Sequence, residues 1–341
     1  MSGGIDSLMA AILLKESGHY QVSAVHLKLF AYDGQEGDIE SLSDTCRSLD
    51  IPLEVVNLER EFRRSVIDFF CREYRFGRTP NPCTTCNKAI KFGFLLDKVI
   101  ADGFDYLATG HYARVKYYPR GYHLLRGRDS SKDQSYFLYR LGQKELKHLV
   151  LPLGNLFKSD IIGKARSMGI KVDGKRDSQD ICFIPGNDYR AFLASCIPLE
   201  EGNIIDTAGN ILGRHRGLPF YTIGQRQKLG VSSGERLYVL EIDAPGNRLV
   251  AGSKKDLISH KLTARDITWV NGTPPVDEGD ITARIRYGEE EAPVLLRDND
   301  VGMEVTFNRA QSAIAPGQDV VFYRGEEVLG GGTIERANRE N

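Results

Sequence analysis

Hydrophobic positions in the first half of the chain alternate between strand-like and helix-like spacing. QVSAVHLKLF (21–30) is an almost continuous apolar run of the kind buried in parallel sheets. LEVVNL (53–58) and DYLATGH (105–111) also have strand character, and residues 8–15, 39–49 and 61–74 have helical spacing. This alternation predicts an α/β fold with a doubly wound parallel sheet over residues 1–190.

The pattern changes from about Gly186 onward. Short β-prone runs follow one another, separated by turn sequences that contain Asp-Asn, Pro-Gly and Gly-Gly. We therefore expect two smaller β-rich domains, a central one over residues 191–254 and a C-terminal β-barrel over 255–341.

Composition narrows the possible partners and compartments. The net charge is −1, so any nucleic-acid contact must come from local basic patches, such as residues 213–228. In that patch no acid offsets the basic side chains of Arg214, His215, Arg216, Arg226 and Lys228. The chain has neither a run of about 18 apolar residues nor a secretory signal, which predicts a cytoplasmic protein without a membrane partner.

The stretch SGGIDS (2–7) precedes a predicted helix. Its glycines allow close approach to an anion, its serines add hydroxyl donors, and the helix start presents free N–H groups, so the stretch predicts a phosphate-binding loop. Asp6 would repel a phosphate unless a cation lay between them, which suggests Mg²⁺. The alternative is a glycine-rich turn that only caps the helix.

The six cysteines suggest reduced thiols rather than a disulfide framework. Cys46 lies on an apolar helical stripe and is expected in the core, and we expect the same of Cys71 and Cys196. In GRTPNPCTTCNKAIKFG (77–93), the pair Cys83 and Cys86 could be a redox pair, half of a metal site or a sulfur-handling nucleophile. Two lysines of this stretch, at positions 88 and 91, would favour the thiolate form.

SGGIDS resembles the SGGxDS signature of PP-loop ATP pyrophosphatases, which split ATP between its α- and β-phosphates. Taken in order, SGGIDS, TPNPCTTCNKAIKF, ATGHYARV, DSSKDQSYFLYRL, DSQDICFI, YTIGQR and APGQDVVFY resemble the tRNA-specific 2-thiouridylases of that superfamily over essentially the whole chain. Members of this family usually have a short apolar strand before the loop. Because this chain begins at the methionine, the first strand is expected to be missing.

The resemblance implies a reaction. ATP would adenylate the 2-position oxygen of the wobble uridine in lysine, glutamate and glutamine tRNAs. Cys182 would carry a persulfide, supplied by a donor such as a cysteine desulfurase relay, and Cys86 would be its partner thiol. Transfer would leave a disulfide between Cys86 and Cys182 through ordinary thiol exchange.

The resemblance also implies binding residues. Those for ATP are Met1, Ser2, Gly3, Gly4, Asp6, Ser7, Leu27 and Gly110. Asn81, Pro82 and Cys83 would lie near an extruded target base. The other expected tRNA contacts are His111, Lys132, Asp133, Gln134, Arg286, Tyr287 and Gln318.

Two alternatives remain open. Cys83 stands where many family members have aspartate, so Cys83, Cys86 and Cys182 could instead hold an iron–sulfur cluster whose unique iron binds hydrosulfide. A PP-loop ligase acting on a small metabolite would not need the tRNA-facing motifs or Cys182, and a chain without its first strand could be a binding module.

Overall fold

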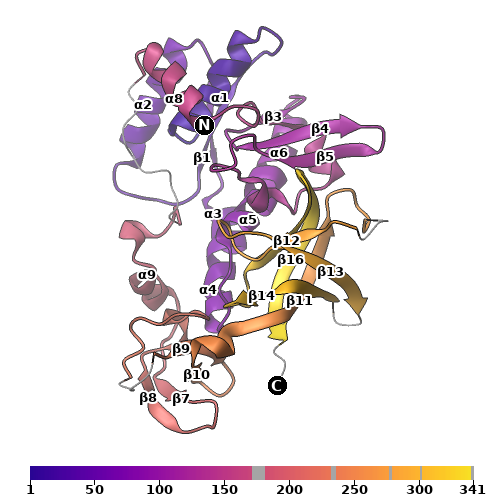
Figure 1. Ribbon diagram of the computed structural model, residues 1–341. Helices are drawn as coiled ribbons and strands as arrows, with labels where there is room; N and C mark the ends of the chain where they lie inside the picture. The colour runs from indigo at the N-terminus through magenta and orange to yellow at the C-terminus, as the bar shows by residue number, and fades with distance from the viewer. Residues whose placement is uncertain (171–180, 232–235, 276–278, 300–301, 339–341) are drawn as a thin grey trace.

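The computed structural model describes residues 1–170, 181–231, 236–275, 279–299 and 302–338. An N-terminal α/β region, a small central β-module and a C-terminal barrel follow one another along the chain (Figure 1). Among the described residues no helix is long and apolar enough to cross a membrane.

The N-terminal region contains parallel strands connected by helices, which confirms the predicted α/β class. Strand β1 (Ala24–Lys28) pairs with β2 (Leu53–Asn57), and β3 (Leu107–Ala108) pairs with β6 (Leu149–Val150). The two pairs are not joined by a strand among the described residues. Helices α1 (Ile5–Glu16), α2 (Gln35–Ser48) and α8 (Lys158–Ser167) lie at the same end of the molecule (Figure 1).

The helix predicted over residues 61–74 is three consecutive segments: α3 (Glu59–Phe62), a π-helix (Arg63–Ile67) and α4 (Asp68–Arg75). Phe62, Val66 and Phe70 recur every four residues and are all buried in one cluster. Phe69, predicted on the same face, is only partly buried, and the Arg72 guanidinium lies 5.5 Å from its ring centroid.

Helix α5 (Pro82–Cys86), a second π-helix (Asn87–Leu95) and α6 (Leu96–Ala101) form another continuous helical run. Further along, α7 (Gln143–Leu146) is a single turn, and α9 (Tyr189–Cys196) leads into the central module. That module has four strands in the order β8-β7-β10-β9. They are β7 (Gly202–Ile205), β8 (Ile211–His215), β9 (Tyr238–Asp243) and β10 (Arg248–Gly252).

The C-terminal strands form a closed six-stranded antiparallel barrel, as predicted. Its strands are β11 (Ile258–Trp269), β12 (Thr282–Arg284), β13 (Ala292–Asn299), β14 (Gly302–Ser312), β15 (Asp319–Arg324) and β16 (Glu327–Asn338). Pairing of β11 with β16 closes the barrel. In β13 the buried Ala292, Val294 and Leu296 alternate with exposed residues, which is the period expected for one buried face.

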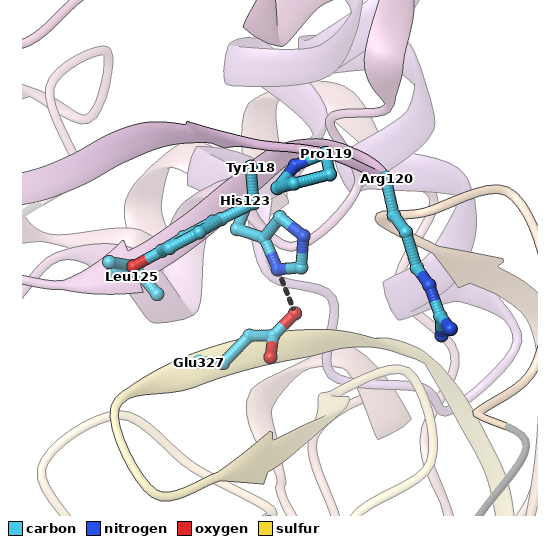
Figure 2. A pocket seen from close by; sticks show the side chains of 6 residues that line it. All are labelled: Tyr118, Pro119, Arg120, His123, Leu125 and Glu327. Carbon is cyan, nitrogen blue, oxygen red and sulfur yellow. Dashed lines mark hydrogen bonds and ion pairs between the residues drawn. The ribbon is translucent and has the colours of Figure 1, made fainter.

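A hairpin from the N-terminal region extends the barrel sheet. Strands β4 (Ala113–Tyr118) and β5 (Gly121–Arg126) pair with each other, and β5 also pairs with β16 (Figure 1). His123 of the hairpin and Glu327 of β16 approach to 2.6 Å in a hollow of about 440 Å³ at this junction (Figure 2). The sequence analysis missed this hairpin, which joins the first and last parts of the chain.

Candidate functional site

The SGGIDS loop leads directly into α1. Gly3 has φ of +77°, a conformation that favours glycine, and Ser2, Gly3 and Gly4 are exposed. The Ser7 hydroxyl donates to the Gly4 carbonyl at 2.9 Å and accepts from the Ser2 amide at 3.1 Å. Among the described residues no side chain caps this 12-residue helix, so its first N–H groups are open to an anion.

Asp6 has a partner that the sequence analysis missed. The Lys158 ammonium lies 2.7 Å from both carboxylate oxygens of Asp6, and the Tyr112 hydroxyl donates to Oδ1 at 2.9 Å. Lys158 is the first residue of α8, and its amide donates to Asp129 at 3.0 Å. The positive charge that we assigned to Mg²⁺ is therefore available from the chain itself.

Gly110 lies against the phosphate loop. A Cβ atom there would come within 2.7 Å of the carbonyl carbon of Asp6 and 3.0 Å of the Ser7 amide nitrogen, so a side chain would displace the loop. Leu27 lies in β1 and is partly buried against two core clusters. The Met1 amino group donates to the Val25 carbonyl, which places Met1 beside the same strand.

The cysteine motif forms a capped helix followed by a widened turn. Pro82 begins α5, and Asn81 Oδ1 accepts from the Cys83 amide at 3.2 Å. A π-helix bonds residue i to residue i+5, so Cys86 and Lys91 are separated by one turn and face the same side. Single π-turns inside α-helices often occur at functional sites.

The structure brings the three motif cysteines together. Cys86 is partly buried, and Cys83 and Cys182 keep exposed surface. Even so, partial loss of water around the sulfur atoms raises the pKa of all three thiols. In addition, the negative charge of one thiolate raises the pKa of a neighbouring thiol. Cys182 acts in this way on Cys83, Cys83 on Cys86, and Cys86 on Cys182. All three are free thiols. Two motifs almost a hundred residues apart in sequence thus meet at one place.

Lys91 supplies the positive charge of this cysteine site. Its ammonium lowers the pKa of all three thiols, opposing the effect of burial. Among the described residues no carboxylate lies within 4 Å of Lys91, whereas Lys88 pairs with Glu145 at 2.8 Å. Of the two lysines predicted to favour thiolate, only Lys91 faces the cysteines.

His111 adjoins the same positive charge. Burial lowers the pKa of His111 well below its usual value, and the Lys91 ammonium lowers it further. Its Nδ1 lies 2.8 Å from the Thr109 hydroxyl. His111 is therefore neutral at physiological pH and adds no second positive charge beside Lys91.

An aromatic cluster anchors the Cys182 segment. Phe183 is buried, and its ring centroid lies 5.7 Å from that of Phe62, 5.4 Å from that of Phe70 and 5.4 Å from that of Phe192. The neighbouring Cys182 remains exposed. The first residues of the DSQDICFI motif, 177–180, lie outside the described residues.

The barrel reaches the cysteine motif through Gln318 and Asp319. Gln318 Nε2 donates to the Thr79 carbonyl at 2.8 Å, and the Thr84 hydroxyl donates to the buried carboxylate of Asp319 at 2.9 Å. The Tyr139 hydroxyl also donates to Asp319, at 2.8 Å. The Gln318 side chain is thus committed to a protein contact, and Asp319 is a residue that the sequence analysis missed.

The remaining predicted tRNA contacts differ in exposure. The carboxylate of Asp133 is buried and accepts from the Gly127 amide at 2.9 Å, while Gln134 accepts from the Tyr112 amide at 3.0 Å. The partly exposed Lys132 lies beside them in sequence. These two acceptors therefore hold the loop in place, and Lys132 and Gln134 are partly exposed.

Arg286 and Tyr287 lie on the barrel side of the same region. Arg286 pairs with Glu289 at 2.8 Å. The Tyr287 ring packs on Phe137 with centroids 4.6 Å apart, and the Phe137 carbonyl accepts from Asn87, the residue after Cys86, at 3.0 Å. Tyr287 is therefore connected to the cysteine helix through a single intervening residue.

The cysteines predicted to lie in the core have different outcomes. Cys46 is buried, as expected, but Cys196 is exposed because it ends α9, so its core prediction was wrong.

The basic patch predicted over residues 213–228 is interrupted at two positions. His215 is buried and bonded to the Asn247 carbonyl at 3.1 Å, and Arg214 lies 3.6 Å from Glu201. Neither belongs to an unopposed basic surface.

Among the described residues no group of three or more His, Cys, Asp or Glu side chains is arranged to hold a metal ion. An iron–sulfur cluster on Cys83, Cys86 and Cys182 therefore stays a prediction.

Comparison with known proteins gives a consistent result. Residues 1–186 match the tRNA methyl transferase HUP domain family, 190–253 the corresponding PRC-barrel domain and 259–334 the aminomethyltransferase β-barrel domain. The chain is 43% identical to tRNA-specific 2-thiouridylase MnmA of Chlorobium chlorochromatii, covering 98% of this chain and 96% of that one. It is 44% identical to the protein of the same name from Syntrophomonas wolfei, covering 98% of each.

One solved structure is related more distantly. It is the U34-tRNA thiolase NcsA from Methanococcus maripaludis with its [4Fe-4S] cluster. The match covers 57% of this chain and 61% of that chain, with 16% sequence identity and a TM-score of 0.35. A superposition this loose says nothing about a cluster in the present chain.

The fold and the matched domains define a tRNA-modifying transferase built on a PP-loop HUP domain, a type of domain associated with ATP binding. The domain descriptions mention methyl transfer, but the relatives that span nearly the whole chain are named thiouridylases. This chain belongs to the tRNA-specific 2-thiouridylase MnmA family.

Proposed function

We propose that this protein uses ATP to convert the wobble uridine of lysine, glutamate and glutamine tRNAs to 2-thiouridine. The observation that carries the proposal is the meeting of Cys83, Cys86 and Cys182 beside the ammonium of Lys91, which has no carboxylate partner in the part of the chain that the structure describes. Thiolate is the form of cysteine that attacks sulfur, and a nearby cation favours it.

Activation of the uridine occurs at the phosphate loop. The exposed loop residues and the open start of α1 bind the ATP phosphates, with Leu27 near the adenine and Gly110 against the loop. The 2-position oxygen attacks the α-phosphate and pyrophosphate leaves. Lys158 neutralises Asp6, which removes a repulsion that would otherwise oppose ATP binding. Mg²⁺ enters the proposal only as a counterion of ATP.

Sulfur transfer then uses Cys182 and Cys86. A persulfide donor, such as a cysteine desulfurase relay, places one sulfur atom on Cys182. The terminal sulfur attacks the 2-position carbon and AMP leaves, after which the Cys86 thiolate attacks the Cys182 sulfur and releases the thiolated base. Release of hydrosulfide by Cys86 before attack on the carbon gives the same products. Either order leaves a Cys86–Cys182 disulfide, which needs two electrons from an external thiol.

The tRNA contacts follow from the same arrangement. Asn81, Pro82 and Cys83 line the place of the extruded base, because they begin the helix that carries Cys86. His111, Lys132, Arg286 and Tyr287 provide further contacts to tRNA, Lys132 and Arg286 through phosphates and Tyr287 through stacking. Asp133, Gln134 and Gln318 contribute by holding their loops in place. We infer that the chain has three domains. The catalytic domain comprises residues 1–190, the central module residues 191–254 and the barrel residues 255–341.

The test is nucleoside mass spectrometry of unmodified lysine tRNA after incubation with the protein, ATP, Mg²⁺ and a persulfide donor, without added iron. We expect 2-thiouridine at the wobble position, dependent on ATP and abolished by Cys182→Ser. The matched control Cys46→Ser, at a buried position in α2, should retain activity. ATP-dependent product with Cys182→Ser would contradict the sulfur-carrying role, and product only after iron reconstitution would favour a cluster.

A further inference from the structure

A second pair of cysteines lies where α9 packs on α4. Cys71 is a partly buried residue of α4, and Cys196 is the exposed last residue of α9. The ring centroids of Phe70 and Phe192 are 6.3 Å apart, so these helix faces touch. Phe192 and Cys196 are four residues apart on α9 and share a face, which directs Cys196 toward α4.

The two thiols lie close enough to influence each other. Burial is the largest cause that raises the pKa of Cys71, to about 12, and the neighbouring Cys196 thiol raises it further. Cys196 is exposed and can be reached by reagents from solvent. Neither residue has a role in the proposed thiolation, so a pair of adjacent thiols is left without an assignment.

We propose that Cys71 and Cys196 form a second dithiol site that closes to an intramolecular disulfide on reaction with a low-molecular-weight disulfide. The exposed Cys196 thiolate attacks the reagent, forms a mixed disulfide and releases one thiolate. The Cys71 thiol then passes its proton to a released thiolate, attacks the Cys196 sulfur and releases the second thiolate. The reagent gains the two electrons that the cysteines lose, and the two released thiolates take up the two thiol protons.

The bond would fasten α9 to α4 next to the Cys182 segment. Phe192 of α9 contacts Phe183 at 5.4 Å between ring centroids, and Phe183 adjoins Cys182 in sequence. Fixing α9 therefore restricts the aromatic cluster in which the Cys182 segment is anchored. The site is thus a redox-sensitive clamp on the segment that carries Cys182.

Peptide mapping of the full chain treated with oxidised glutathione tests the proposal without tRNA or ATP, so its outcome does not depend on the proposed function. Trypsin places Cys71 in peptide 65–72, Cys196 in 191–214, Cys86 in 79–88 and Cys182 in 177–190. We expect 65–72 joined to 191–214. Glutathione on 191–214 while 65–72 keeps a free thiol would overturn the proposal.

Hydrogen exchange provides a second readout. Oxidation should slow exchange of the amides in 181–197 several-fold in the parent protein, because α9 can no longer separate from α4. The matched variant Cys71→Ser can form only the mixed disulfide and should show no slowing. Equal exchange before and after closure of the disulfide would overturn the clamp.

Discussion

The hydroxyl of Thr84 donates to the carboxylate of Asp319 at 2.9 Å, joining two residues that are 235 positions apart in the chain. Thr84 lies between the two cysteines of the CTTC motif, whereas Asp319 begins strand β15 of the barrel. The C-terminal barrel therefore holds the cysteine helix directly. This contact explains how a domain remote in sequence can position the thiols.

Removal of the Asp319 carboxylate should destabilise this junction. Asp319→Ala removes the buried carboxylate that accepts from Tyr139 and Thr84 and pairs with Arg140, which costs about 3 kcal/mol of unfolding free energy. Thr84→Val removes the hydroxyl that donates to Asp319 and to the Asn81 carbonyl, and should cost about 1 kcal/mol. Chemical denaturation measures both, with the exposed Asp44→Asn as control. Parent-like stability of Asp319→Ala would contradict this role.

Lys91 is predicted to set the reactivity of the thiols. Lys91→Met removes the cation that lowers the pKa of Cys83, Cys86 and Cys182, so the pH profile of their alkylation should shift to higher pH. A shift of one pH unit corresponds to an about ten-fold slower reaction at neutral pH. Lys88→Met, in the same helical run, should react at the parent rate because Lys88 pairs with Glu145. Equal slowing in both variants would refute the assignment.

Lys158 is predicted to support ATP binding. Lys158→Met leaves the charge of Asp6 uncompensated beside the phosphate loop, which should weaken ATP binding about ten-fold. Titration of nucleotide binding measures the change. The control is Lys164→Met, in the same helix α8 as Lys158. It removes only an exposed ion pair with Glu16 of α1, so this variant should bind ATP like the parent protein. Unchanged affinity in Lys158→Met would rule out the proposed compensation.

Stability should fall on mild acidification. Burial lowers the pKa of His111 well below its usual 6.5, so the unfolded chain binds protons that the folded chain does not. Unfolding free energy is therefore lost as pH falls below about 6.5, by up to about 1.4 kcal/mol per pH unit. His215 has the same direction of shift, caused first by burial. Thermal melting of His111→Gln should show a weaker pH dependence; an unchanged dependence would contradict the account.

Much of the architecture is predictable because it follows from local periodicity. The helix ending at Glu16, the strand containing Leu27 and the alternation in β13 all have the expected spacing, although β1 is only partly buried after its first residue. The β4–β5 hairpin and strand β11 were missed, because their burial depends on partners far away in the chain. The doubly wound parallel sheet was predicted from this periodicity, and the described residues contain two parallel strand pairs, β1–β2 and β3–β6.

The site was predictable only in part for the same reason. Motifs indicated Cys86 and Cys182, but no sequence spacing indicates that Lys158 pairs with Asp6 or that Asp319 reaches Thr84. A lysine that begins a helix and an aspartate that begins a strand are ordinary features in a sequence. Only the pairing across the fold makes them informative. The π-helix that places Cys86 and Lys91 on the same side could not be predicted either, because hydrophobic spacing with a period of 3.6 residues indicates only an α-helix.

The most direct test of the central claim is a single turnover without reductant. Protein carrying a Cys182 persulfide is mixed with ATP and unmodified lysine tRNA, quenched with an alkylating agent and digested with trypsin. The account predicts one disulfide joining peptides 79–88 and 177–190 for each 2-thiouridine formed. Formation of 2-thiouridine while Cys86 and Cys182 both remain alkylatable thiols would contradict it.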